Sequence, residues 1–248
     1  MFDFANLLFA GPCSARCSFC IGRQLDPRLS VNNLNEFPPR NLDRFIDLII
    51  QHGIRQVVFT GTTTDPQLYR HEARLLDLLR SHLPPATQYA LHTNARLALK
   101  KLATFNAYDR VCISLPTFNA ATYVKMMGVR GVPDLAALLD RARVPIKISC
   151  LINAHNFAEI PEFVARCQQL NIKRLVLRQL YGERGAWPCI DGLSPRGEYR
   201  GSQVYDYGGL EITFWDFDRS ESTSLNLFSS GVISDTYLLA QTQVTNTA

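Results

Sequence analysis

Three cysteines lie within one short stretch near the N-terminus, GPCSARCSFCIG, as Cys13, Cys17 and Cys20. Thiolates spaced C-x3-C-x2-C repel one another unless they share a metal, so the spacing predicts a metal centre. Structural zinc needs a fourth cysteine or histidine, yet the nearest histidine, His52, follows a predicted helix. An iron–sulfur cube on three cysteines leaves one iron open for a cofactor or substrate. The missing fourth ligand therefore favours a reactive cluster over structural zinc.

The other four cysteines give weaker signals. Cys150 and Cys167 fall on apolar faces of predicted elements, where a buried, unreactive thiol is the favoured interpretation, and Cys112 falls within a predicted strand. Cys189, in the loop AWPCIDG, could donate a hydrogen atom to a product radical, but an exposed cysteine without a role is the favoured interpretation. Seven cysteines form a poor disulfide framework and favour a reducing compartment.

Composition narrows the function classes. A chain of 248 residues with 46% hydrophobic content predicts one large core. The net charge of +4 arises from 26 basic and 22 acidic residues without a polybasic run, so no nucleic-acid partner is expected. No apolar stretch approaches the roughly 18 residues of a membrane span, and no signal-peptide pattern opens the chain. We expect a cytoplasmic protein with no membrane partner.

Strand and helix patterns alternate along the chain, which is typical of an α/β fold with a parallel sheet. Predicted helices begin at Asn41 and near Leu97, and others precede Pro84, follow the fourth strand and follow the fifth. A Gly- and aromatic-rich tail predicts a hairpin around Gly208 and Gly209. The six predicted strands are Asn6–Ala10, Gln56–Thr60, Gln88–Thr93, Arg110–Leu115, Pro145–Ile152 and Arg174–Leu180.

Five of these strands carry polar residues on one face, counting the positions that directly follow them. Buried parallel strands are normally apolar on both faces, so a repeated polar face predicts a curled sheet with a wet or ligand-filled interior. We expect function at the carboxyl ends of the strands. The polar face comprises Thr60, Thr62, His92, Asn94, Cys112, Ser114, Lys147, Ser149, Asn153 and Arg178.

With Phe19 included, the cysteine motif resembles the signature of the radical S-adenosylmethionine (radical SAM) superfamily, C-x3-C-x-φ-C with φ aromatic. Three later segments support the resemblance. Residues 59–66 (FTGTTTDP) stand where the family carries a Gly-Gly-Glu-Pro-like segment. Residues 92–96 (HTNAR) and 112–128 resemble segments of the branch that includes molybdenum-cofactor synthesis and peptide-modifying enzymes.

The resemblance implies a partial (βα)6 TIM-like barrel with a short C-terminal β extension. Residues 1–181 would form the radical SAM core, with a cluster loop at 11–40, and residues 182–248 a C-terminal loop and β-hairpin extension. It further implies one [4Fe-4S] cluster on Cys13, Cys17 and Cys20, whose open iron chelates S-adenosylmethionine. The tail holds only Cys189, so no auxiliary-cluster domain is expected.

The resemblance also assigns roles to individual residues. Gly61-Thr62-Thr63 replaces the usual Gly-Gly-Glu, so Asp65, threonine hydroxyls or backbone carbonyls would have to receive the amino group of S-adenosylmethionine. Arg178 would bind a carboxylate of the cofactor or of the substrate. The S-adenosylmethionine contacts predicted are Phe19, Thr60, Gly61, Thr62, Asn94, Ser114, Asn153 and Arg178, and the predicted substrate contacts are His92, Lys147, Glu183 and Trp187.

The implied activity is reductive cleavage of S-adenosylmethionine to a 5′-deoxyadenosyl radical, which abstracts hydrogen from a small-molecule or peptide substrate. An electron donor such as flavodoxin or ferredoxin is the expected partner. Two alternatives stay open. One is an activating protein for a glycyl radical enzyme, and the other is a non-catalytic iron–sulfur or zinc-binding module, which the altered Gly-Gly-Glu segment supports.

Overall fold

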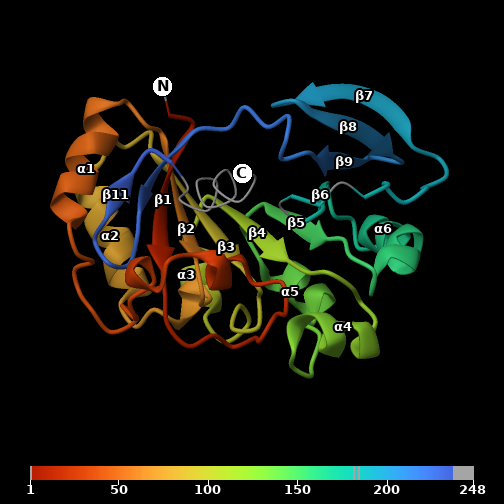
Figure 1. Ribbon diagram of the computed structural model, residues 1–248, viewed down its shortest axis with the longest axis horizontal. Coiled ribbons are helices and arrows are strands. Elements are labelled where there is room, and N and C mark those ends of the chain that lie inside the picture. Colours follow the sequence, from red (N-terminus) through yellow and green to blue (C-terminus); the bar gives the residue numbers. More distant parts are fainter. Residues whose placement is uncertain (1, 181, 184, 237–248) are drawn as a thin grey trace, which may run out of the picture.

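The computed structural model describes residues 2–180, 182–183 and 185–236 (Figure 1). All its strands join one sheet in the order β11-β10-β1-β2-β3-β4-β5-β6-β9-β8-β7. The strands are β1 Phe4–Phe9, β2 Gln56–Gly61, β3 Gln88–Thr93, β4 Arg110–Ser114, β5 Ile146–Leu151, β6 Arg174–Arg178, β7 Ser194–Tyr199, β8 Ser202–Tyr207, β9 Leu210–Trp215, β10 Ser224–Leu227 and β11 Ile233–Ser234.

The helices link the strands of the parallel core. In α1 the residues Leu42, Phe45, Ile46 and Ile49 recur at helical spacing and are buried, so hydrophobic burial holds this helix in place. The α-helices are α1 Leu42–Gln51, α2 Glu72–His82, α3 Leu102–Phe105, α4 Ala120–Met127, α5 Leu135–Arg141 and α6 Ile160–Gln169. Short 3₁₀ helices are η1 Ile21–Gln24, η2 Pro27–Leu29, η3 Pro66–Leu68 and η4 Phe157–Glu159.

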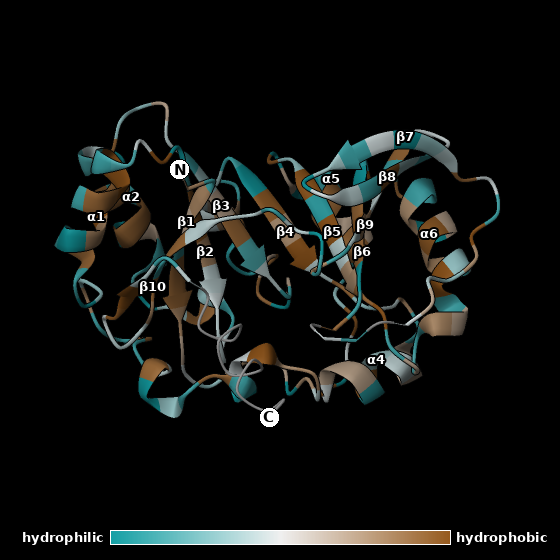
Figure 2. Cartoon of the chain, turned by 45° about the horizontal axis from the view of Figure 1, so that its top comes forward, coloured by the Kyte–Doolittle hydropathy of each residue, from teal (hydrophilic) through white to brown (hydrophobic). Residues whose placement is uncertain are grey.

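Strands β1 to β6 are parallel and adjacent in chain order, which confirms the predicted α/β architecture. Each of the six predicted strands is present, with ends within two residues of the prediction. The sheet curves without closing, as in a partial barrel, and hydrophobic residues concentrate on its strands and on the helix sides that face them (Figure 2).

The C-terminal extension adds strands to both edges of this core. The predicted hairpin is present as β8 and β9 around Gly208 and Gly209. Strand β9 pairs in parallel with β6, and β10 pairs in parallel with β1. Residues 216–223, which we call the crossing segment, therefore connect one edge of the core sheet to the other (Figure 1). The division at residues 181 and 182 remains a prediction.

The helices after β3 and β4 differ from the sequence-based expectation. The predicted helix near Leu97 is a single turn, α3, that begins at Leu102. The segment after β4 forms two helices, because Asn119 caps α4 by accepting hydrogen bonds from the backbone of Ala121 and Thr122, and Gly128 ends it in the left-handed conformation. Across the described ranges, no helix has the length and apolar character of a membrane span.

Candidate functional site

A cavity of about 800 Å³ opens at the carboxyl ends of the barrel strands and reaches into the curved sheet. Its walls come from the strand face that the sequence pattern marked as polar, from the cluster loop and from the crossing segment. Strand residues in the wall include Asn6, Thr60, His92, Ser114, Ser149, Leu151, Arg178, Trp215 and Ser224. The predicted polar interior is thus present as a cavity.

The three motif cysteines all line this cavity. Their loop is fixed from the far side by α4, because the backbone N–H of Arg16 donates to the carbonyl of Met127 at 2.8 Å. The Cys17 thiol lies 3.6 Å from the Met127 sulfur. The Asn94 amide lies 3.9 Å from the sulfur of Cys13. The segments that follow β3 and β4 therefore both contact the motif.

The cysteines fit an iron–sulfur cluster by their chemistry. Burial raises the pKa of the Cys17 thiol to about 12, with the Cys20 and Cys13 charges adding to the shift, and burial also raises the pKa of Cys13. The thiols of Cys13 and Cys17 are thus held neutral until a metal displaces their protons. Among the described residues, no three His, Cys, Asp or Glu side chains are positioned to hold a single metal ion. A cluster does not require this arrangement, because each cysteine binds a separate iron.

The segment after β2 packs directly under the cluster loop. Thr62 donates through its N–H and its hydroxyl to the carbonyl of Phe9, at 2.8 and 3.1 Å. The Thr64 hydroxyl donates to the carbonyl of Pro12 at 2.5 Å. Two threonine hydroxyls are thus engaged by backbone, while the carbonyl of Thr62 lies 3.5 Å from the Cys20 sulfur. The Thr62 carbonyl is therefore an acceptor beside Cys20 at the cavity wall.

Asp65 is a structural centre of the site and is 4% exposed. Its carboxylate accepts hydrogen bonds from the backbone of Gln67, the hydroxyl of Thr93 and the backbone of Asn94, the last at 2.7 Å. These bonds fix the loop that carries Asn94 beside the cluster loop. Its acceptor positions are therefore largely occupied within the protein.

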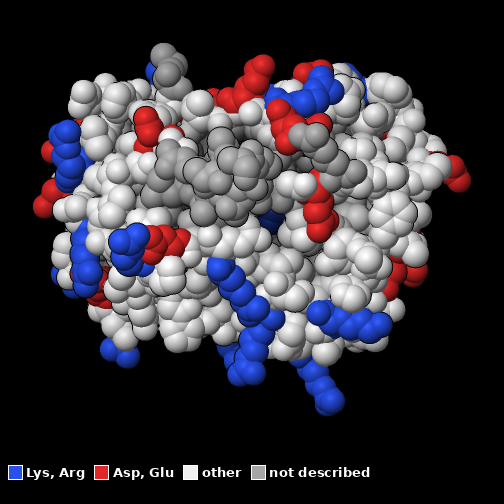
Figure 3. Space-filling model, viewed as in Figure 1, with Lys and Arg blue, Asp and Glu red and all other residues white. Residues whose placement is uncertain are grey.

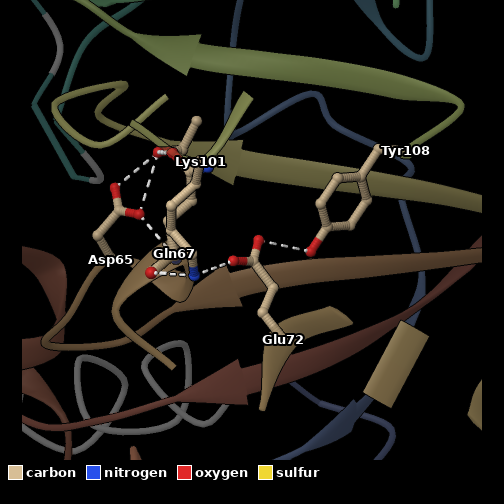
Figure 4. A network of polar contacts seen from close by, with 6 residues as sticks. Asp65, Gln67, Glu72, Lys101 and Tyr108 are labelled. Atoms are coloured by element: carbon tan, nitrogen blue, oxygen red, sulfur yellow. Dashed lines mark hydrogen bonds and ion pairs between the residues drawn. The ribbon is translucent and has the colours of Figure 1, made fainter. Parts of the chain in front are cut away.

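A second buried network supports the same loops from outside the barrel. Lys101 donates to the Gln67 carbonyl at 2.6 Å and pairs with the carboxylate of Glu72, which is 1% exposed (Figure 4). The Tyr108 hydroxyl donates to the other Glu72 oxygen at 3.0 Å. Burial raises the pKa of Glu72, and its bonds to Lys101 oppose that shift. The pairing satisfies a carboxylate that would otherwise be costly to bury.

Most predicted cofactor contacts meet at the cavity. Phe19, Thr60, Gly61, Thr62, Asn94, Ser114 and Arg178 all line it. Asn153 does not, since its side chain accepts from the backbone of His155 at 2.9 Å and shapes the loop after β5. These placements are geometric, and the binding roles remain predictions.

The predicted substrate contacts divide into three positions. His92 lines the cavity from β3. Lys147 of β5 faces the same side of the sheet as His92, because both residues are register partners of Cys112 on β4. Lys147 is not part of the cavity wall. Glu183 and Trp187 line a separate pocket of about 230 Å³ next to Trp215. Trp187 stacks on Phe214, with ring centres 5.0 Å apart.

Sequence reasoning missed part of the cavity wall. Met127, Trp215 and residues 217, 220 and 222–224 line the cavity, yet none was predicted as a site residue. Met127 lies within residues 112–128, a segment that resembles the family. Comparison with that segment could have identified Met127 as a site residue. The C-terminal residues carried no local signal, because their position depends on β9 and β10 pairing with distant strands.

The sequence model of the Radical SAM superfamily matches residues 8–177, and the chain belongs to this family of iron–sulfur, S-adenosylmethionine-binding enzymes. A curated relative named "Probable GTP 3′,8-cyclase", from Saccharolobus islandicus (strain M.14.25 / Kamchatka #1), is 26% identical over 136 residues. The match covers 52% of this chain and 42% of the relative. The chain thus spans less than half the length of the curated relatives it matches.

Solved structures of low identity share the fold. Streptococcus suis SuiB bound to S-adenosylmethionine superposes with a TM-score of 0.54 at 19% identity, over 72% of this chain and 39% of SuiB. The structure of anSMEcpe with bound AdoMet and the Kp18Cys peptide has a TM-score of 0.54 at 17% identity, over 74% of this chain and 54% of that one. The α/β partial barrel predicted from the sequence is confirmed.

Proposed function

We propose that this chain cleaves S-adenosylmethionine reductively at one [4Fe-4S] cluster held by Cys13, Cys17 and Cys20. The observation that supports it most is the meeting of all three cysteines with Thr62, Asn94 and the polar strand face at one cavity of about 800 Å³. A cluster held by these cysteines would supply one electron for cleavage of the C5′–S bond of S-adenosylmethionine, which yields methionine and the 5′-deoxyadenosyl radical. That radical takes a hydrogen atom from a small-molecule or peptide substrate.

Four residues around the cavity would hold S-adenosylmethionine. The Thr62 carbonyl, beside Cys20, would accept from the cofactor amino group in place of the missing glutamate. Asn94, fixed by Asp65, and Ser114 on β4 would orient the nucleoside part. Phe19 would cover the cofactor from the cluster loop. A flavodoxin- or ferredoxin-like protein would supply the electron.

The test compares two cysteine variants after anaerobic reconstitution with iron and sulfide. In Cys17→Ala, removal of a cluster ligand should abolish cluster assembly and S-adenosylmethionine binding. Cys189→Ala, an exposed cysteine outside the cavity, is the matched control and should match the parent chain. Iron and sulfide analysis measures cluster assembly, and equilibrium dialysis measures S-adenosylmethionine binding, in each variant. Retention of a full cluster in Cys17→Ala would refute the proposed ligand set.

A further inference from the structure

Arg178 is the polar group in the cavity that the proposed function leaves without a settled ligand. It ends β6 on the inner face of the sheet and lines the cavity. Its Nε is buried and has no hydrogen-bond partner, and no ion pair joins Arg178 to another described residue. Burying a guanidinium N–H without an acceptor costs free energy. An acceptor from a ligand would remove that cost.

One other cation, Lys147 on the neighbouring strand β5, and the neutral His92 lie on the same sheet face as Arg178. His92 faces the same cavity from β3, and the positive charges of Lys147 and Arg178 both contribute to lowering its pKa. Lys147 has no ion-pair partner in the described ranges either. Clustered cations without a counter-charge repel one another. The local charge therefore favours an anionic ligand.

The acidic residues of the cavity do not neutralise this cluster. Asp65 lies by the cluster loop and accepts its hydrogen bonds from Gln67, Thr93 and Asn94. Asp235 is exposed, beyond β11. A hollow near the middle of the face in Figure 3 shows basic atoms at its bottom. The interior near β6 is thus positively charged.

The position of Arg178 favours substrate over cofactor. The predicted cofactor contacts other than Arg178 and Asn153 come from the cluster loop and from strands β2 to β4 or the loops after them, whereas Arg178 lies on β6 beside Trp215 of β9. Trp215, the register partner of Arg178, also lies well beyond residues 8–177, the part that the family model matches. Substrate specificity is carried by such added parts of a common fold.

We propose that Arg178 and His92 bind a carboxylate or phosphate group of the substrate, so that the substrate of this chain is an anion. Ser222 lines the same cavity from the C-terminal extension and brings a hydroxyl donor to it, whereas the Ser224 hydroxyl donates to Asn226. The proposal rests on the proposed function, because it places substrate beside the cofactor in the same cavity. It is tested through binding, so the two can fail separately.

The experiment measures binding of inorganic phosphate and of acetate to the reconstituted protein saturated with S-adenosylmethionine, by isothermal titration calorimetry. One of the two anions should bind to the parent chain, and Arg178→Gln should weaken that binding at least about tenfold, as expected for loss of a charge-assisted hydrogen bond. Arg178→Lys, which keeps the charge, should recover part of it. Whether phosphate or acetate binds identifies the anionic group.

Arg174→Gln is the matched control, because Arg174 lies on the same strand but pairs with Glu211 at 3.0 Å on an exposed surface. It should bind the anion as the parent chain does. Unchanged binding in Arg178→Gln, equal loss in Arg174→Gln, or binding only when S-adenosylmethionine is absent would each overturn the proposal. Failure of the proposed function would instead appear as no 5′-deoxyadenosine from the parent chain, whatever the anion result.

Discussion

At the scale of single residues, the cavity wall contains two kinds of polar group: those proposed to take part in the chemistry and those that position them. Cys13, Cys17 and Cys20 are near one another and open to the cavity, as a cluster requires. Asp65 also lines the cavity, but its carboxylate oxygens accept hydrogen bonds from Thr93 and Asn94. A carboxylate in an active-site loop is therefore a positioning group here.

His92 gives a pH prediction at the same scale. Its depth in the barrel, together with the positive charges of Lys147 and Arg178, lowers its pKa to about 3. We expect a neutral His92 at pH 7, assigned by NMR with a His92→Gln variant and titrating well below the usual value of about 6.5. Arg178→Gln should raise its pKa and Arg174→Gln should not. Titration of His92 near 6.5 in the parent chain would contradict this.

The same shift has a consequence for stability. A folded-state pKa below the unfolded value means that the unfolded chain binds the proton more readily. The contribution of His92 is therefore present above about pH 6.5 and is lost as the pH falls toward its folded pKa. Acid unfolding should begin at higher pH in the parent chain than in His92→Gln, as followed by circular dichroism. Coincident acid transitions would refute the assignment to His92.

At the scale of elements, close backbone packing between the cluster loop and the segment after β2 sets the site geometry. A Cβ on Gly22 would lie 2.0 Å from the carbonyl oxygen of Thr62, a contact that only backbone movement can relieve. Gly22 is the second residue of η1, whose N-cap is Cys20, so such a movement would displace a predicted cluster ligand. Glycine is required there by close approach rather than by its φ angle.

Gly22→Ala should therefore lower cluster content after reconstitution severalfold and lower the unfolding temperature of the chain. Gly185→Ala is the control, because its Cβ would meet only the flexible end of Gln179 at 3.3 Å. Iron analysis and differential scanning fluorimetry measure the two effects. Full cluster occupancy in Gly22→Ala would show that the loop approach is not tight.

Most strands and helices were predictable from the sequence, whereas the hydrogen-bond partners of individual side chains were not. The strand patterns of β1 to β6 were clear because buried apolar runs and turn residues are local signals. Thr62 was predicted as a cofactor contact, and the structure shows that its hydroxyl donates to the backbone of Phe9, which leaves its carbonyl as the group proposed for that role. Residue type alone cannot distinguish a hydroxyl that faces a ligand from one that braces a neighbouring loop.

At the scale of the whole molecule, the C-terminal extension joins the two edges of the core sheet. This arrangement was not predictable, because the pairing of β10 with β1 links residues more than two hundred positions apart. Asn6 donates to Asn226 at 2.8 Å across that pair, and Asn226 is fully buried. The bond connects the first and one of the last strands beside the cavity.

Asn226→Ala should destabilise the chain by about 1–3 kcal/mol, because the buried Asn6 amide loses its acceptor. Urea unfolding of Asn6→Ala, Asn226→Ala and the double variant forms a mutant cycle. The double variant should cost less than the sum of the two single changes. Additive costs would mean that the two side chains do not interact.

Radical cleavage of S-adenosylmethionine can be assayed in a single reaction. The chain is reconstituted anaerobically with iron and sulfide, reduced in the presence of S-adenosylmethionine, and assayed for 5′-deoxyadenosine by mass spectrometry. We predict a product that depends on the cluster and the reductant, in spite of the altered Gly-Gly-Glu segment. No 5′-deoxyadenosine, with about one zinc per chain and no S-adenosylmethionine binding, would contradict the account and assign the three cysteines to a structural metal site.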